Sequence, residues 1–293
     1  FVAALLCDGA AAYDQNLVRQ RIHDLSEIGY HMLSEILEGV EVNLNAHLTS
    51  RSLKDIFFPQ VENLLAFKRE GKHLELIAPE LANEPTIAFG VRACDARSFE
   101  LLDKVFLKAP VDAYYAARRK ACTLIGLGCS APEETCFCGT FGIDATKPAT
   151  DVATWLVGDE LYWEAQTEKG EALTKALGAL LEAAEAAPVA EQQAATKAML
   201  KAMPLGSFKI AEKIPADELK TFNSAAWDKL SAGCLSCCSC TFVCPTCQCY
   251  DIRDFDTGAE IQRFRCWDSC MYSDFTLMAH GTNRPTQMER FRQ

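Results

Sequence analysis

The feature that most constrains this chain is a dense group of cysteines near its C-terminal end. The chain has 293 residues and 15 cysteines, and seven of these cysteines fall within residues 234–249. Disulfide frameworks are typical of small secreted chains with an even number of cysteines, whereas this chain is long and its cysteine count is odd. The apolar stretch from Phe1 to Leu6 is too short for a signal peptide and follows no charged segment. We therefore expect thiolates that bind metal in a reducing compartment, the cytoplasm.

The spacing of these cysteines indicates which metal they bind. Cys234, Cys237, Cys240 and Cys244, followed by Pro245, give the pattern C-x2-C-x2-C-x3-C-P, the ligand run of bacterial-type 4Fe-4S ferredoxins. Three thiolates on a tight loop can bind three irons of one cubane, while the fourth follows a turn and can reach another cluster. A zinc ribbon would use two well-separated C-x2-C pairs. The sequence predicts at least one 4Fe-4S cluster, with a zinc-bound scaffold as the alternative.

Further cysteines surround this run. The additional candidate ligands are Cys247, Cys249 and Cys270. Cys266 fits a ligand role least well and is equally explained as a buried thiol, since free cysteine is among the most buried residue types. Cys238 falls out of register with the run, and Cys7 and Cys122 have no cysteine at a ligand-like spacing. We interpret these last three as structural residues.

The remainder of the chain predicts an α+β fold in two domains. Apolar runs bounded by breakers predict strands, and apolar residues at helical spacing predict helices. The expected strands cover residues 73–78, 85–91 and 121–127, with a hairpin over 152–165. The expected helices cover residues 15–38, 96–106, 170–203 with a break at Pro188, and 217–232. Breakers in 204–216 separate an α/β-type domain over 1–215 from a ferredoxin-like iron-sulfur domain over 216–293, in which a loop of mixed charge precedes Cys266.

The N-terminal half holds a second set of four cysteines. Cys94 and Cys129 follow the first and second strands of a predicted strand–helix–strand unit, and Cys136 and Cys138 lie on the next loop. If the two strands are parallel neighbours, both strands end at the sheet edge where α/β proteins place their ligands. Four thiolates are what one cubane needs, so we expect a further cluster here. The alternative is that all four are small buried residues.

Two other features near these cysteines allow more than one interpretation. Residues 126–131 formally fit the dinucleotide pattern G-x-G-x-x-A, but Pro132 and a cysteine-bearing loop follow where a nucleotide site needs a long helix. Four arginines either face an anionic cluster or form surface ion pairs, and the sequence does not choose between these roles. They are Arg92, Arg97, Arg118 and Arg119.

Composition and missing motifs narrow the function. The formal net charge is −11, which is atypical of nucleic-acid-binding proteins, and no apolar run approaches the length of a membrane span. We find no nucleophile–base pair, no flavin or nicotinamide motif and no catalytic residue. The sequence therefore predicts an electron-transfer chain without catalysis of its own. The alternative is an enzyme subunit that binds its own substrate in the N-terminal α/β domain.

Several segments resemble a family of redox subunits that carry a 4Fe-4S dicluster domain, including sulfhydrogenase beta subunits and the A subunit of anaerobic sulfite reductase. The likeness covers roughly residues 50 to 293. The matching segments are Phe58 to Glu62, Phe89 to Asp95, Leu102 to Phe106, Cys136 to Cys138, Cys234 to Asp251, Arg265 to Cys270 and Arg284 to Arg292.

This resemblance implies a role in a hetero-oligomeric oxidoreductase of anaerobic metabolism. The chain would relay electrons between a flavin-containing, NAD(P)H-linked subunit and a catalytic hydrogenase or reductase subunit, through two or three 4Fe-4S clusters. Dicluster domains of this family carry a second C-x2-C-x2-C-x3-C run downstream, whereas this sequence ends at Gln293. In the paired arrangement Cys244 serves the second cluster, so the fourth ligand of the first cluster stays open.

Overall fold

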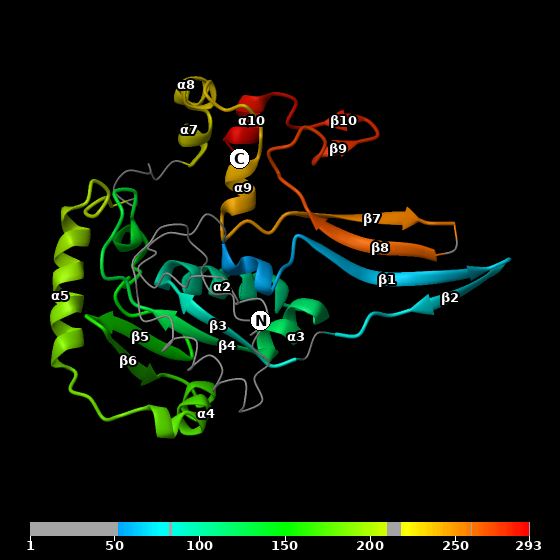
Figure 1. Cartoon of the computed structure of the whole chain (residues 1–293). Coiled ribbons are helices and arrows are strands. Elements are labelled where there is room, and N and C mark those ends of the chain that lie inside the picture. The colour runs from blue at the N-terminus through cyan, green and yellow to red at the C-terminus, as the bar shows by residue number, and fades with distance from the viewer. Residues whose placement is uncertain (1–51, 82–83, 210–217, 259, 293) are drawn as a thin grey trace. The chain divides into compact units, whose positions relative to one another are not determined.

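The computed structural model describes residues 52–81, 84–209, 218–258 and 260–292, which form two compact units (Figure 1). Described residues 52–56 and 84–208 belong to the first unit, while 57–81 and those from 209 onward belong to the second. The second unit is thus built from two separate stretches of sequence. Mixed helices and sheets confirm the predicted α+β class. Cys7 and the helix expected over residues 15–38 lie outside the described residues.

A four-stranded sheet with the order β3-β4-β5-β6 lies at the centre of the first unit (Figure 1). Its strands are β3 (Thr86–Val91), β4 (Cys122–Leu127), β5 (Val152–Val157) and β6 (Glu160–Ala165). The first three run parallel and β6 is antiparallel to β5. All six residues of β4 are buried, as is typical of a central parallel strand. The strands predicted at 85–91 and 121–127 and the hairpin at 152–165 are confirmed.

Helices of the first unit separate or follow these strands in the sequence. They are α2 (Ala93–Phe106), α3 (Ala113–Ala121), η2 (Cys138–Phe141), α4 (Glu168–Ala176), η3 (Gly178–Leu180) and α5 (Ala187–Ala202), preceded by η1 (Leu53–Ile56). Phe99, Leu102 and Phe106 are buried on α2, as their spacing predicted. Pro188 lies in the first turn of α5. The helical segment predicted over 170–203 is broken, as expected, over residues 181–186, and Pro188 lies at the start of the second helix, where its missing N–H needs no partner.

Helix α4 packs into the core beside this sheet. Leu173 is fully buried and shares a cluster with Ile87, Ile125, Val152 and Leu177. Gly170, in the first turn of α4, allows this close approach, because an added Cβ there would lie 2.0 Å from the Asp151 carbonyl oxygen. The core therefore fixes β3 and β4, and with them the start of the loops that follow both strands.

An antiparallel sheet with the order β2-β1-β8-β7 organises the second unit. Its strands are β1 (Val61–Glu70), β2 (His73–Ile77), β7 (Tyr250–Asp256) and β8 (Glu260–Trp267). The strand predicted at 73–78 is confirmed as β2. The prediction that a loop of mixed charge precedes Cys266 was wrong. These residues form the β7–β8 hairpin. The charged residues pair across the hairpin, as Arg263 does with Asp254 at 2.7 Å.

Short elements complete the second unit. They are α7 (Glu218–Phe222), α8 (Ala226–Ser231), α9 (Ser239–Val243), α10 (Gln287–Phe291) and the hairpin of β9 (Leu277–Met278) and β10 (Gly281–Thr282). The continuous helix predicted over 217–232 was wrong, because the chain leaves the helix between α7 and α8. The Ser224 hydroxyl accepts a hydrogen bond from the N–H of Ala226 at 3.2 Å, which favours a new helix start there. No helix in the described ranges is long and apolar enough to cross a membrane.

A buried ion pair joins the two stretches of sequence in the second unit. Arg265 on β8 pairs with Glu62 on β1, and the two residues are 2% and 6% exposed. The Arg265 guanidinium lies 5.2 Å from the ring centre of Phe58 and 5.6 Å from that of Tyr250. Trp267 donates a hydrogen bond from its indole N–H to the Phe58 carbonyl at 3.1 Å. These contacts hold the start of β1 against the end of β8.

Candidate iron-sulfur centres

The predicted ferredoxin-like run occupies a tight loop and helix α9 in the second unit. Ser236 and Cys238 have φ angles of 53° and 61°, in the left-handed region that non-glycine residues rarely adopt. The N–H of Ser236 donates a hydrogen bond to the Cys234 sulfur at 3.4 Å. Cys237 and Cys240 are exposed, whereas Cys238 is only 2% exposed. The turns therefore expose Cys237 and Cys240, leave Cys234 and Cys244 half-buried, and bury the out-of-register Cys238.

Cys244 and Cys247 form a thiol pair just after α9. The Cys247 thiol, through a hydrogen bond, is the main cause that lowers the pKa of Cys244 below its ordinary value. The Thr246 hydroxyl lies 3.2 Å from the Cys244 sulfur and acts in the same direction. Two candidate ligands thus lie in direct contact, and the local environment favours a thiolate at one of them.

Cys249 and Cys270 form a second thiol pair at the open end of the β7–β8 hairpin. Cys249 precedes β7, Cys270 follows β8, and the N–H of Asp268 donates to the Cys249 carbonyl at 3.0 Å. Burial raises the pKa of Cys270, and the Cys249 thiol raises it further. Cys266 lies within β8, in register with Val61, and burial likewise raises its pKa. The hairpin therefore explains how two cysteines 21 positions apart come together.

In the first unit, the four predicted cysteines lie just after β3, just after β4 and at the end of the loop that leads to η2. Cys94 is the second residue of α2, directly after β3, and Cys129 lies two residues beyond β4. Cys138 begins η2, and Cys136 accepts a hydrogen bond at its sulfur from the N–H of Glu133 at 3.3 Å. Since β3 and β4 are parallel neighbours, Cys94 and Cys129 follow the same edge of the sheet. This is the placement that the sequence predicted.

The four thiols also lie close enough to affect one another's ionisation. Burial raises the pKa of Cys94 to about 12, with Cys138 and Cys129 among the further causes. Burial raises the pKa of Cys138 to about 11, and Cys129 and Cys136 add to this effect. Each thiol therefore interacts electrostatically with at least one other, and Cys129 interacts with all three.

The glycines of the G-x-G pattern have packing roles in this loop. A Cβ on Gly126 would lie 2.5 Å from the Thr150 hydroxyl oxygen, and one on Gly128 would lie 2.5 Å from the Trp155 ring. The Trp155 indole N–H donates to the Thr146 carbonyl at 2.6 Å, so the ring is fixed in place. Because they lack a Cβ, the two glycines allow the backbone before Cys129 to pack closely against Thr150 and Trp155.

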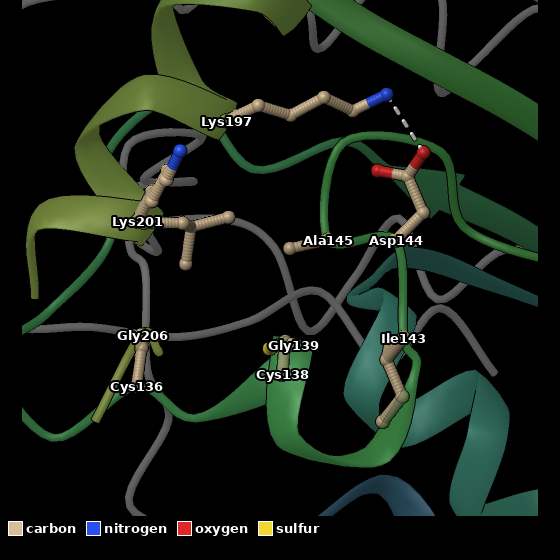
Figure 2. A pocket seen from close by; sticks show the side chains of 10 residues that line it. Cys136, Cys138, Gly139, Ile143, Asp144, Ala145, Lys197, Lys201 and Gly206 are labelled. Atoms are coloured by element: carbon tan, nitrogen blue, oxygen red, sulfur yellow. Dashed lines mark ion pairs between the residues drawn. The ribbon is translucent and has the colours of Figure 1, made fainter. Parts of the chain in front are cut away.

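A pocket of about 230 Å³ lies beside two of these cysteines (Figure 2). Its wall includes Cys136, Cys138 and two lysines of α5, Lys197 and Lys201. Lys197 forms an ion pair with Asp144 at 2.9 Å. The pocket therefore combines thiols with two lysines, one of which is paired with an aspartate of the same wall.

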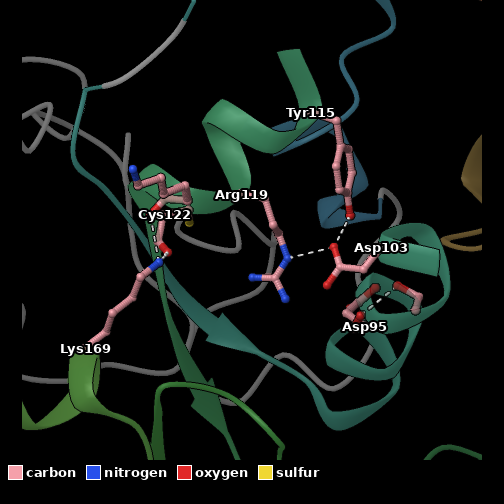
Figure 3. A network of polar contacts seen from close by, with 8 residues as sticks. Asp95, Asp103, Tyr115, Arg119, Cys122 and Lys169 are labelled. Carbon is pink, nitrogen blue, oxygen red and sulfur yellow. Dashed lines mark hydrogen bonds and ion pairs between the residues drawn. The ribbon is translucent and has the colours of Figure 1, made fainter. Parts of the chain in front are cut away.

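Cys122 lies in a polar network that stabilises the first unit (Figure 3). Burial raises the pKa of Cys122 to about 11. Lys169 donates to the carbonyl of Cys122 at 2.8 Å, and Asp103 accepts from the Tyr115 hydroxyl at 2.7 Å and from Arg119 at 3.1 Å. These bonds link α2, α3, α4 and β4, and Cys122 occupies the position of a structural residue.

The chemistry of these donors fits iron-sulfur clusters. Cluster ligands are thiolates, and the cysteines in the described part of the chain are all free thiols. Within the described residues, no three His, Cys, Asp or Glu side chains are arranged around a single metal ion. Cluster ligands bind irons at different corners of a cubane, so they are spaced more widely than the ligands of one ion. Iron would also supply the positive charge that buried thiolates such as Cys94 require.

Comparison with known proteins decides the family. Residues 233–293 match the model of the 4Fe-4S dicluster domain. The chain belongs to the redox subunits that carry this domain. It is also 35% identical over 221 residues to the Sulfhydrogenase 2 subunit beta of Pyrococcus furiosus, an alignment that covers 70% of this chain. No solved structure gives a significant match.

The family match covers only the C-terminal part of the chain. The match covers all seven predicted ligands of the second unit and shows that 4Fe-4S clusters are the cofactors of this domain. The match does not extend to Cys94, Cys129, Cys136 and Cys138. The chain spans about three fifths of the length of the sulfhydrogenase subunit, 61% of it.

Proposed function

We propose that this chain is a cytoplasmic electron-transfer subunit of an anaerobic oxidoreductase complex. It would pass electrons between a flavin-containing, NAD(P)H-linked subunit and a catalytic subunit of the hydrogenase or reductase type. The observation that carries the proposal is the presence of one group of thiols in each compact unit. When bound, a 4Fe-4S cluster takes up or releases one electron. Two groups provide separate points of entry and exit.

Each group has a distinct set of proposed ligands. In the second unit these are Cys234, Cys237, Cys240, Cys244, Cys247, Cys249 and Cys270. In the first unit they are Cys94, Cys129, Cys136 and Cys138. The Ser236 N–H donates a hydrogen bond to the Cys234 sulfur in the tight loop, and the Thr246 hydroxyl helps to lower the pKa of Cys244. Two or three clusters are expected in all.

The relay proposal also explains why a partner is needed. NAD(P)H gives up a hydride, whereas an iron-sulfur cluster accepts single electrons, so a flavin must separate the two electrons. The relative from Pyrococcus furiosus is a subunit of a sulfhydrogenase by name, which supports a hetero-oligomer as the working state. We therefore assign the flavin step and the terminal chemistry to other chains.

The test uses the purified, iron-replete chain and its partners. The isolated chain should accept electrons from dithionite, give cubane signals by EPR, and show no turnover with NADH, hydrogen or sulfite. A tagged copy expressed in its host should co-purify with a flavoprotein and a hydrogenase or reductase subunit. Steady turnover by the isolated chain, or zinc in place of iron, would contradict the proposal.

The pocket beside Cys136 and Cys138 supports a second candidate, an enzyme subunit with its own substrate. Its volume of about 230 Å³ suits only a small molecule, since pockets for drug-sized ligands measure roughly 300–1,000 Å³. Lys201 at the pocket wall favours an anion, and sulfite is the probe to use. Turnover of sulfite by the isolated chain that falls in Lys201→Ala, with the cluster signals unchanged, would establish this candidate.

A further inference from the structure

Arg92 is a buried arginine at the junction of β3 and α2. It occupies the N-cap position of α2, the helix that contains Cys94, with an extended backbone, and it is only 4% exposed. Its Nη1 atom donates hydrogen bonds to the carbonyl oxygens of Leu127 and Gly128, each at 3.2 Å. These carbonyls are the last two before Cys129. The side chain therefore crosses from the end of one strand to the end of its parallel neighbour.

This path brings the guanidinium against the sulfur of Cys129. Arg92 and Cys129 form a side-chain hydrogen bond, in which the guanidinium is the donor. Burial raises the pKa of the Cys129 thiol, while the charge of Arg92 and this hydrogen bond act in the opposite direction. The same positive charge also opposes the effect of burial on the pKa of Asp95. Arg92 thus places a buried positive charge beside Cys129, one member of the four-thiol group.

The other arginines near this group have different contacts. Arg97, one turn further along α2, is 44% exposed at its side chain and forms an ion pair with Glu100. Arg119 pairs with Asp103 at 3.1 Å on the network of α2 and α3. Of these three, Arg92 is the one whose hydrogen bonds reach the residues just before Cys129, a proposed ligand.

We propose that Arg92 is a positioning residue that raises the reduction potential of a cluster held by Cys94, Cys129, Cys136 and Cys138. This inference rests on the proposed cluster in the first unit. Reduction adds one electron from an external donor to that cluster, and no bond forms or breaks. The added negative charge is stabilised by a nearby positive charge and by a hydrogen bond to a ligand sulfur. In a buried site this attraction is far less screened than at the surface.

A purely structural role is the competing explanation. In that case the guanidinium would only hold the carbonyls at the end of β4, and its loss would weaken the fold without changing the electron affinity of the cluster. The two explanations differ in one measurable quantity, the midpoint potential. A lysine at this position keeps the charge but cannot reproduce the forked hydrogen bonds of arginine.

The experiment is an EPR-monitored redox titration of the full-length, iron-replete chain. Cys138→Ser first identifies the signal of the N-terminal cluster by its loss. Arg92→Gln should then shift the midpoint potential of that signal to lower values, and Arg92→Lys should shift it less. Arg97→Gln, on the same helix, is the matched control and should leave the potential unchanged. The signals of the C-terminal clusters should stay constant in all variants.

The outcomes separate this inference from the cluster proposal. If Cys138→Ser removes no signal, the N-terminal cluster does not exist and the role of Arg92 is overturned with it. If the signal exists but keeps its potential in Arg92→Gln, the cluster stands and Arg92 is structural. If Arg92→Gln cannot take up the cluster, Arg92→Lys decides: a lowered potential supports the proposal, and an unchanged potential overturns it.

Discussion

The buried Glu62–Arg265 pair offers a direct test of what holds the second unit together. Glu62→Gln keeps the shape of the side chain but leaves the Arg265 charge, which is 2% exposed, without its carboxylate. Removing one partner of a buried pair costs about 3–5 kcal/mol. Phe58 and Tyr250 still contact the guanidinium, and a cation–π contact is worth about 0.5–2 kcal/mol. We therefore expect Glu62→Gln to lower the stability of the second unit by an amount near the lower end, about 3 kcal/mol.

This cost should appear as faster hydrogen exchange in β1 and β8. About 1.4 kcal/mol corresponds to a tenfold change in an equilibrium constant, so 3 kcal/mol raises the opening equilibrium by roughly 100-fold. Exchange measured by mass spectrometry should therefore accelerate by that order in both strands. The amides of β3 and β4, in the first unit, serve as the internal reference and should not change.

Arg263→Gln is the matched control for this experiment. Arg263 lies on the same strand, but its pair with Asp254 is about half exposed, with side-chain exposures of 45% and 49%. Exposed pairs contribute little, so exchange should stay at the wild-type rate. The double variant Glu62→Met with Arg265→Met should recover most of the protection, because an apolar pair leaves no buried charge. Equal exchange in Glu62→Gln and Arg263→Gln would refute the reasoning.

Three further changes test the first unit. Leu173→Ala should lower the free energy of unfolding by about 2–5 kcal/mol in a denaturant titration, because the side chain is fully buried in the core; a smaller loss would mean that α4 repacks. Gly128→Ala should weaken the N-terminal cluster signal, because its Cβ would meet the Trp155 ring at 2.5 Å, and an unchanged EPR spectrum would show that the loop adjusts. Cys122→Ser should keep the full iron content, since Cys122 lies within β4 in a structural position; a lost cluster would make it a ligand.

Much of the first unit could be predicted because its signals are local. The strands β3 and β4 are short apolar runs between breakers, and the turn of the β5–β6 hairpin is marked by Gly158. The β7–β8 hairpin was missed because charged residues interrupt its apolar ones, and their partners lie on the neighbouring strand. The break between α7 and α8 was missed because Ser224 and its neighbours are not strong helix breakers. The assignment of residues 57–81 to the second unit depends on contacts distant in sequence, such as the one between Glu62 and Arg265.

The candidate sites likewise combine features that a local sequence pattern predicts with features that depend on contacts distant in sequence. The C-x2-C-x2-C-x3-C-P run was recognisable because one loop supplies its ligands. The second group could be predicted only through the expectation that two strands are parallel neighbours. The sequence named Arg92 as one of four arginines that could face a cluster, but it could not single out Arg92, because its place beside Cys129 follows from a side chain that spans two strand ends. Spacing predicts candidate ligands, whereas the residues around them depend on the tertiary structure.

The two groups of thiols differ in how much packed structure would hold them in place without metal. In the first unit, Cys94 and Cys129 follow strands that lie in a packed core, and β4 is buried along its whole length. In the second unit, Cys238 is the one buried residue between 232 and 250. Helix α9 has five residues, far fewer than the roughly 12–15 that an isolated helix needs. The C-terminal loop therefore depends more heavily on its cluster.

Backbone strain adds to this dependence. Ser236 and Cys238 both adopt the left-handed region, which costs roughly 1–2 kcal/mol for each such residue. Removal of iron with a chelator should accordingly release residues 233–249 to fast hydrogen exchange, while β3 and β4 stay protected. Reconstitution with iron and sulfide should restore the protection of the loop. If the loop stays protected in the metal-free chain, packing alone must hold its two left-handed residues, and the argument from strain and exposure fails.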